Sequence, residues 1–208
     1  MTAIFTCGVI IATLFGNSLA SGLDIISTPC CRAVSVLRPG PPGKNISGVI
    51  ELHQEGSNRL VTITGQVHGL PPNSTHGFHI HESGDFRNIE NPCLSTGPHY
   101  NPLSSVHGAP EKTARHVGDL GNIQADENGV ATVNVTDSVV SLIGPYSVIG
   151  RAIVVHENID DLGVNDGESK KTGNAGSRIA CGIIGTVYEK PLEVRYIYGL
   201  YKLNSVLH

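Results

Sequence analysis

Recurring short β-rich runs, separated by turn residues, constrain the fold of this chain more than any other feature of its sequence. Ser47–Leu52 and Leu60–Gly65 partly alternate polar and apolar residues, which is the period-two pattern of a strand with one buried face. A turn signal at Asp126–Gly129 separates two further runs. The predicted strands are Ala33–Leu37, Gly48–His53, Leu60–Val67, His76–Glu82, Val117–Gln124, Gly129–Val135, Arg151–His156 and Arg178–Tyr188. About eight short strands in one domain indicate an all-β sandwich or flattened barrel.

The composition agrees with a β domain that has a core of its own. The chain has 208 residues, which suggests one domain with appendages, and its 39% hydrophobic content argues against wholesale disorder. Charged residues make up 15%, against about 25% in an average soluble domain, and the 25 glycines disfavour a long-helix protein. A formal net charge of −4 leaves no basic excess to hold a polyphosphate, so the sequence predicts no nucleic-acid partner.

Two long segments lack the strand pattern. They are Ser83–Arg115 and Glu157–Ser177, and each connects two predicted strands. Loops of this length inside a compact domain are usually functional. We therefore expect the functional site where these segments meet the strands.

The N-terminal segment has the features of a secretory signal. Residues 1–20 carry no charge, Ala3–Phe15 is apolar, and Ser18–Ala20 is a small-x-small triplet suited to signal-peptidase cleavage. We therefore predict a signal peptide at 1–20 and a secreted, extracellular protein. An uncleaved anchor or a buried segment are the alternatives, because no Lys or Arg precedes the apolar run. No other stretch is long and apolar enough to be a transmembrane segment.

Three N-x-S/T sequons support secretion, and none has proline at its middle position. Asn45 and Asn73 follow Pro-rich turns, where an exposed side chain is expected. Asn134 lies inside a predicted strand. We predict N-glycosylation sites at all three asparagines.

Four cysteines remain once the signal peptide is set aside, namely Cys30, Cys31, Cys93 and Cys181. In an oxidising compartment they should pair, and four cysteines allow three connectivities. The adjacent pair Cys30 and Cys31 could bridge to each other only under strain, or one of them could form an intermolecular disulfide.

Histidines cluster at the edges of the two long segments, and their spacing is informative. His79 and His81 are two residues apart on one predicted strand, so both imidazoles point to the same face and can bind one metal ion. An isolated H-x-H pair is more often structural than metal-binding, but here four more histidines and an aspartate follow at loop edges. These are His99, His107, His116, Asp119 and His156. Imidazole-dominated ligation with one carboxylate favours copper or zinc.

Four blocks of the sequence resemble the signature blocks of copper/zinc superoxide dismutases. They are Gly77–Glu82, Gly97–Pro102, His116–Asn122 and Gly173–Arg178. The similarity runs in order from about Ala33 to Val187 and implies an eight-stranded Greek-key β-sandwich or flattened barrel, Ig-like, with two long functional loops. We accordingly expect an N-terminal extension at 21–32, a copper/zinc superoxide dismutase domain at 33–188 and a C-terminal tail at 189–208. The tail could be frayed, an added strand or a docking segment.

The resemblance also implies two metal sites and their support. Copper would be held by His79, His81, His99 and His156, and zinc by His99, His107, His116 and Asp119, with His99 bridging the two. Asp160 matches the carboxylate that links a copper-site histidine to a zinc-site histidine. His76 matches a buried structural histidine, and Cys93 and Cys181 match the intrasubunit disulfide.

The catalytic residues implied by the resemblance are His99 and Arg178, the arginine beside the copper. Glu168, Lys171 and Thr172 fall in the loop that lines the substrate channel, although Lys170 could share or replace the role of Lys171. The segment between His81 and Cys93 is longer than in common cytosolic members. That loop contributes to the family's dimer interface, so the dimer geometry stays open.

The function implied is that of an extracellular superoxide dismutase with one copper and one zinc per subunit. Cu(II)/Cu(I) cycling would convert superoxide to O₂ and H₂O₂, zinc would be structural, and an arginine-guided channel would admit the anion. The expected partners are superoxide and a second copy of the chain in a homodimer, with the copper donor unknown. A metal carrier or a copper-chaperone domain are the alternatives. Arg178 argues against a carrier, and the absence of a C-x-x-C motif argues against a chaperone.

Overall fold

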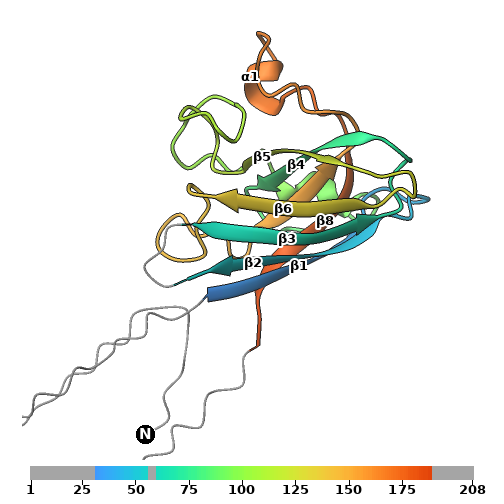
Figure 1. Cartoon of the computed structure of the whole chain (residues 1–208), viewed down its shortest axis with the longest axis horizontal. Coiled ribbons are helices and arrows are strands. Elements are labelled where there is room, and N and C mark those ends of the chain that lie inside the picture. Colours follow the sequence, from blue (N-terminus) through green and yellow to red (C-terminus); the bar gives the residue numbers. More distant parts are fainter. Residues whose placement is uncertain (1–30, 56–59, 189–208) are drawn as a thin grey trace, which may run out of the picture.

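The computed structural model describes residues 31–55 and 60–188 (Figure 1). The expected signal peptide at 1–20, most of the 21–32 extension, Cys30 and the 189–208 tail lie outside the described residues. The first strand begins at Cys31, so Cys31 and Arg32 belong to the sheet, inside the range expected as the extension. Cys31 is disulfide-bonded.

All eight predicted strands are present in the described part of the chain, and the all-β fold class is confirmed. The strands are β1 (Cys31–Pro39), β2 (Ser47–Gln54), β3 (Val61–His68), β4 (Thr75–His81), β5 (Asp119–Gln124), β6 (Ala131–Asp137), β7 (Ala152–His156) and β8 (Arg178–Thr186). Helical structure among the described residues is limited to the 3-10 turn η1 (Pro92–Thr96) and the short helix α1 (Ser169–Thr172).

The strands form one antiparallel sheet that curls into a nearly closed barrel. Their order is β5-β4-β7-β8-β1-β2-β3-β6, and an isolated bridge between Ala125 and Ala131 joins the two edges. Consecutive strands are not always neighbours: β1 pairs with β8, β3 with β6, and β4 with β7. These crossings are the Greek-key connections that the resemblance implies. Figure 1 shows β6, β3, β2 and β1 side by side, with β4 and β8 behind them.

The core fills the barrel with one set of alternating side chains from each strand. On β2 the pattern is strict, since Ile50 and Leu52 are buried while Val49 and Glu51 are exposed. On β4 both faces are buried: Phe78 and Ile80 enter the core, and His79 and His81 alternate with them yet are equally inaccessible. Alternation puts the two histidines on the outer side of the barrel wall, so other chain segments must cover them.

Two long connections supply this cover. One runs from β4 to β5 and contains η1, and the other runs from β7 to β8 and contains α1. Figure 1 shows α1 at the top of the view, beyond β5 and β4. A disulfide between Cys93 in η1 and Cys181 in β8 fastens the first connection to the barrel wall. The two segments without strand pattern are therefore the ones that enclose the histidines.

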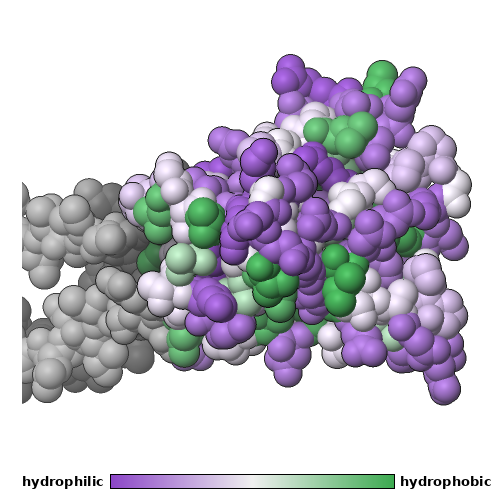
Figure 2. Space-filling model, turned by 90° about the horizontal axis from the view of Figure 1, so that it is seen from above, coloured by the Kyte–Doolittle hydropathy of each residue, from purple (hydrophilic) through white to green (hydrophobic). Residues whose placement is uncertain are grey.

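The surface is mainly polar. Figure 2 shows one face, on which hydrophilic residues predominate and apolar residues form separate patches. Ile89, in the loop between β4 and η1, is 96% exposed. Among the described residues, no helix is both long enough and apolar enough to cross a membrane.

Ile80 should be essential to the wall that carries the histidines. Ile80→Ala removes a side chain that is 0% exposed, and we expect it to lower the free energy of unfolding by about 2–5 kcal/mol, because the cavity can collapse only in part. Chemical denaturation measures the loss. The matched control is Ile89→Ala, which should change stability by less than about 0.5 kcal/mol. Equal effects of the two substitutions would contradict this account of the core.

Candidate metal centre

Strand pairing brings three histidines to one place on the outside of the barrel. His79 and His81 lie on β4, which pairs with β7, and His156 ends β7 at an irregularity in its pairing with β8. His99 follows η1 and forms an isolated bridge with His81. All four imidazoles are buried.

The first group consists of His79, His81, His99 and His156, whose ring nitrogens lie within 4.8 Å of one another. The Nδ1 atom of His81 donates to the Gly97 carbonyl (2.8 Å), and that of His156 to the Gly176 carbonyl (3.1 Å). Their Nε2 atoms then face each other at 3.1 Å. In neutral imidazoles both of these atoms are acceptors, so a cation between them would satisfy both lone pairs.

Two further ring nitrogens of this group lack partners within the described structure. His79 Nε2 is bonded to Asp160 Oδ2 (2.9 Å), which leaves His79 Nδ1 buried and unpaired. His99 Nε2 is likewise buried without a partner. Four nitrogens thus present lone pairs to one small volume, and an all-imidazole donor set of this kind fits copper.

The second group consists of His99, His107, His116 and Asp119. The Nδ1 atoms of the three histidines lie 3.0, 2.9 and 3.1 Å from Asp119 Oδ1, in that order. His107 Nδ1 is buried and faces this oxygen without another partner among the described residues. Three nitrogens and one carboxylate oxygen are a donor set that fits tetrahedral zinc.

His99 belongs to both groups. Its Nδ1 faces Asp119, and its Nε2 is the unpaired atom of the first group. The two groups therefore meet at one imidazole ring, whose two nitrogens point to different ligand sets.

Asp160 supports both groups from behind. Its Oδ2 accepts from His79 and its Oδ1 accepts from His107 Nε2 at 2.8 Å, so one carboxylate fixes the orientation of one ring in each group. Asn122 holds Asp160 by reciprocal hydrogen bonds to its backbone. Gly173, at φ 63°, lies against this carboxylate, and a Cβ there would be 1.7 Å from Asp160 Oδ1. A side chain at position 173 would displace the carboxylate.

Electrostatics favour neutral imidazoles in the first group. Burial lowers the pKa of His79 and of His81 well below the ordinary value, and it lowers the pKa of His156 to about 4. Burial also lowers the pKa of His99, against the opposing effect of Asp119. Neutral imidazole is the form that ligates metals, so these rings are ready to bind at neutral pH.

The second group contains an ionised carboxylate instead. Burial opposes ionisation of Asp119, but hydrogen bonds from His107, His116 and His99 outweigh it and hold its pKa well below the usual range. Burial lowers the pKa of His107, yet the hydrogen bonds and charges of Asp119 and Asp160 outweigh that effect and raise it to about 9. A divalent cation would supply the positive charge that the proton on His107 provides without it.

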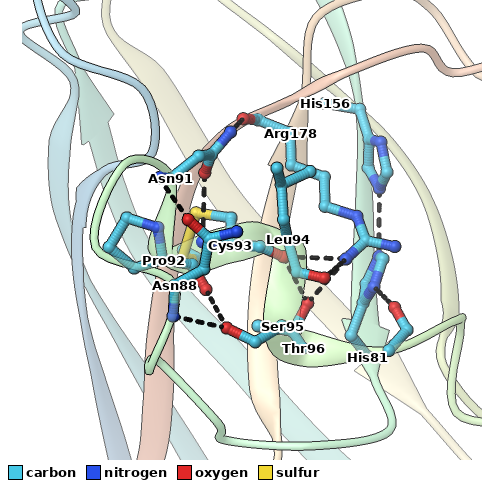
Figure 3. Close-up of a disulfide and its surroundings, with 12 residues drawn as sticks. His81, Asn88, Asn91, Pro92, Cys93, Leu94, Ser95, Thr96, His156 and Arg178 are labelled. Atoms are coloured by element: carbon cyan, nitrogen blue, oxygen red, sulfur yellow. Dashed lines mark hydrogen bonds between the residues drawn. A yellow bond between two sulfur atoms is a disulfide. The ribbon is translucent and has the colours of Figure 1, made fainter.

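Arg178 lies beside the first group and is fixed by η1 (Figure 3). The side chain is half-buried, which lowers its pKa, and its Nη1 donates to the carbonyls of Cys93 (2.8 Å) and Leu94 (3.1 Å) and to Thr96 Oγ1 (3.2 Å). Cys93 is in turn bonded to Cys181, so the disulfide and the arginine share one segment.

The residues expected to line a channel gather at α1. Glu168 caps the helix, and Lys171 Nζ lies 3.7 Å from its Oε2, with the Lys171 side chain 74% exposed. Thr172 Oγ1 donates to the Glu168 carbonyl at 3.2 Å. Lys170 differs from its neighbour, since its ammonium donates to the Gly163 carbonyl at 2.5 Å and is half-buried. Lys171 therefore presents the freer charge.

His76 belongs to none of these groups of ligand atoms. It is buried, its Nδ1 donates to the backbone carbonyl of His156 at 2.8 Å, and its Nε2 lies 2.6 Å from Ser74 Oγ. The side chain therefore supports the end of β7.

An ion pair that sequence reasoning missed connects the second group to β6. Arg115 donates through Nη1 to the carbonyls of Asp119 (2.8 Å) and His116 (3.4 Å), and through Nη2 to Asp137. Both side chains of the Arg115–Asp137 pair are nearly inaccessible, at 2% and 3% exposure. Arg115 directly precedes a candidate ligand, which is a weak signal, and nothing in the sequence connects it to Asp137.

The sequence matches one family model and several relatives, all of which are described as copper/zinc superoxide dismutases. Residues 46–184 match the family model described as copper/zinc superoxide dismutase (SODC). Relatives named superoxide dismutase [Cu-Zn] from Candida glabrata and Saccharomyces cerevisiae are 54% and 50% identical over 155 residues, 74% of this chain and 97% of theirs. A Haemonchus contortus protein named extracellular superoxide dismutase [Cu-Zn] is 52% identical over 150 residues, 72% of this chain and 78% of that protein.

Breaking the buried Arg115–Asp137 pair should cost much of the stability. Asp137→Ala leaves the Arg115 guanidinium charged in a site that is nearly inaccessible to solvent. We expect a loss of about 3–5 kcal/mol in the free energy of unfolding, measured by chemical denaturation. The control is Glu51→Ala, which removes a pair with Arg32 whose side chains are 59% and 47% exposed. That change should cost at most about 1 kcal/mol. A loss for Asp137→Ala as small as that of the control would disprove the anchoring role.

Proposed function

The chain belongs to the copper/zinc superoxide dismutase family, and from that membership we propose that it is a secreted enzyme whose metals are held by the two groups that share His99. The activity itself is the dismutation of superoxide to O₂ and H₂O₂, with one copper and one zinc per subunit. The shared imidazole is the observation that carries the assignment, because it joins an all-histidine site to a three-histidine, one-carboxylate site.

In this proposal His79, His81, His99 and His156 hold copper, and His99, His107, His116 and Asp119 hold zinc. When bound, copper supplies the one-electron oxidation and reduction, while zinc has no redox chemistry and fixes the structure. Asp160 keeps the His79 and His107 rings in the tautomer that leaves their Nδ1 atoms free for ligation.

His99 is also placed to handle a proton. Dismutation of two superoxide anions consumes two protons to form H₂O₂. His99 Nε2 faces the all-histidine group and has no other partner among the described residues, so it can hold a proton and give it to the product. His99 Nδ1 stays directed at Asp119, 3.0 Å away, which keeps the ring in position while Nε2 changes its state.

In the proposed mechanism Arg178 binds the superoxide anion and Lys171 attracts it. The described contacts of the Arg178 guanidinium all involve Nη1, so its other edge is available to a small anion beside the all-histidine group. The exposed ammonium of Lys171 adds positive charge on the approach, with Glu168 and Thr172 forming the rest of the channel wall. On a protein of net charge −4, such a local positive path would raise the association rate.

Secretion and dimer formation complete the proposal. The signal sequence predicted at 1–20, the exposed positions of Asn45, Asn73 and Asn134, and the name of the Haemonchus contortus relative support an extracellular enzyme. Ile183 on β8 is 44% exposed and lies against Gly84 in the loop between β4 and η1. This exposed apolar side chain supports a homodimer formed through β8 and that loop.

Expression of the full chain in insect cells tests the proposed function. We expect protein in the medium that begins at Ser21, contains one copper and one zinc per chain, and dismutates superoxide at a rate that falls as salt is added. Retention inside the cell with an intact N-terminus would contradict secretion. Full metal content without dismutation would favour a metal carrier instead.

Arg178→Glu separates anion guidance from metal binding. We expect kcat/KM to fall at least about tenfold, because a local positive charge can raise association rates by that much or more, while copper and zinc content stay unchanged. The control is Arg32→Glu, an equal change of charge at an exposed position of β1, opposite His53 on β2, on a strand that bears none of the candidate metal ligands. If both variants lose activity equally, net charge rather than Arg178 sets the rate.

A further inference from the structure

The outer face of β1, β2, β3 and β6 carries an open depression of about 740 Å³, on strands that bear none of the candidate metal ligands. Figure 1 shows these four strands side by side across one half of the barrel. One lining residue, Asn134 on β6, belongs to the sequon Asn134–Thr136. The other two sequon asparagines, Asn45 and Asn73, do not line the depression.

The strand register sets the distance from Asn134 to the rest of this face. Asn134 is opposite Thr64 on β3, and Thr64 is opposite Glu51 on β2. Adjacent strands are about 4.8 Å apart, so the β2 row lies about 10 Å from Asn134. Val49 lies in the next row along β2 and is opposite Val36 on β1.

The surface of the depression combines apolar and hydrogen-bonding groups. Val36 and Val49 form a cross-strand pair and are 52% and 49% exposed, which leaves an apolar patch facing water. Polar side chains surround the patch, and those that line the depression include Glu51, Thr64, Gln66 and Thr132. Gly65 contributes no side chain, and a Cβ there would lie 2.1 Å from the Val49 carbonyl. A sugar ring, with apolar C–H faces and equatorial hydroxyls, matches such a surface.

Asn134 itself is accessible. Its side chain is exposed, and within the described structure its amide makes no hydrogen bond. Its neighbours on the same face are Thr132 and Thr136 on β6 and Thr64 directly opposite on β3, with Thr62 and Gln66 diagonal to it. Asn134 itself lines the depression, so a substituent on its Nδ2 would begin at the edge of that surface.

We propose that Asn134 carries an N-linked glycan whose first N-acetylglucosamine residues lie over this depression and cover Val36 and Val49. The donor is an oligosaccharide linked to a lipid diphosphate. A bond forms between Asn134 Nδ2 and the anomeric carbon of the sugar, the bond from that carbon to the phosphate oxygen breaks, and the amide loses one proton as the lipid diphosphate leaves. This inference rests on the proposed secretion, because the transfer occurs in the secretory pathway.

Glycopeptide mass spectrometry of the protein from insect-cell medium tests the modification. We expect Asn134 to be occupied, Thr136→Ala to remove that glycan, and the matched Thr136→Ser to retain it, since serine preserves the sequon. Secreted protein with Asn134 bare, whether or not Asn45 or Asn73 is modified, would overturn this inference and leave the proposed function intact. Retention inside the cell with all three sequons bare would overturn both.

A double-mutant cycle on the metal-loaded enzyme tests the contact with the valines. We expect Thr136→Ala to lower the Tm by about 2–4 °C relative to Thr136→Ser. Val49→Ser should lower the Tm of the glycosylated protein and have much less effect when combined with Thr136→Ala or with Asn134→Gln. Val139→Ser, at a valine that is 39% exposed and outside the depression, should have the same effect with and without the glycan. Equal effects of Val49→Ser in both backgrounds would overturn the contact.

Discussion

The burial of six imidazoles and two carboxylates against the outside of a barrel wall is the constraint on which the rest of this structure depends. A buried polar atom without a partner costs about 1–3 kcal/mol, and the ring nitrogens of the two groups outnumber the protein partners available to them. The chain satisfies one nitrogen of a ring and leaves the other for a metal: His81 with Gly97, His156 with Gly176, and His79 with Asp160. Metal binding thereby becomes part of the folding energetics.

The two long connections follow from this constraint. Imidazoles on the outer side of β4 and β7 can be desolvated only if the chain folds back over them, which requires segments long enough to cover a strand. Each connection is then fixed to the wall. The first is held by the Cys93–Cys181 disulfide and by the ion pair between Arg115 and Asp137. The second is held by the hydrogen bond that the backbone N–H of Asp160 donates to the Asn122 side chain on β5. The same η1 carbonyls that cover the site hold Arg178, so cover and anion guidance depend on one segment.

Much of the fold could be predicted from the sequence because strand alternation and turn residues are local signals. The H-x-H pair at His79 and His81 is a local signal too. Its burial is not local, because it depends on the two long connections that cover the outer face of β4. Arg115–Asp137 could not be predicted, since the pairing depends on how β6 passes the loop before β5. The different surroundings of Lys170 and Lys171 likewise depend on the path of the loop, because only there does the Gly163 carbonyl come within reach of one ammonium.

The closed sheet separates two kinds of surface. β4, β7 and β8 form the wall against which the histidines and Arg178 are covered, whereas β1, β2, β3 and β6 expose a mixed apolar and polar face to water. Because β8 and β1 are neighbours, these halves share one core but turn their outer faces in different directions. A glycan on β6 can therefore cover exposed valines without narrowing the approach to Arg178 and Lys171. Substitutions on that face should also disturb the two groups of candidate ligands less than substitutions of equal size on β4, because Ile80 and the histidines alternate on that strand.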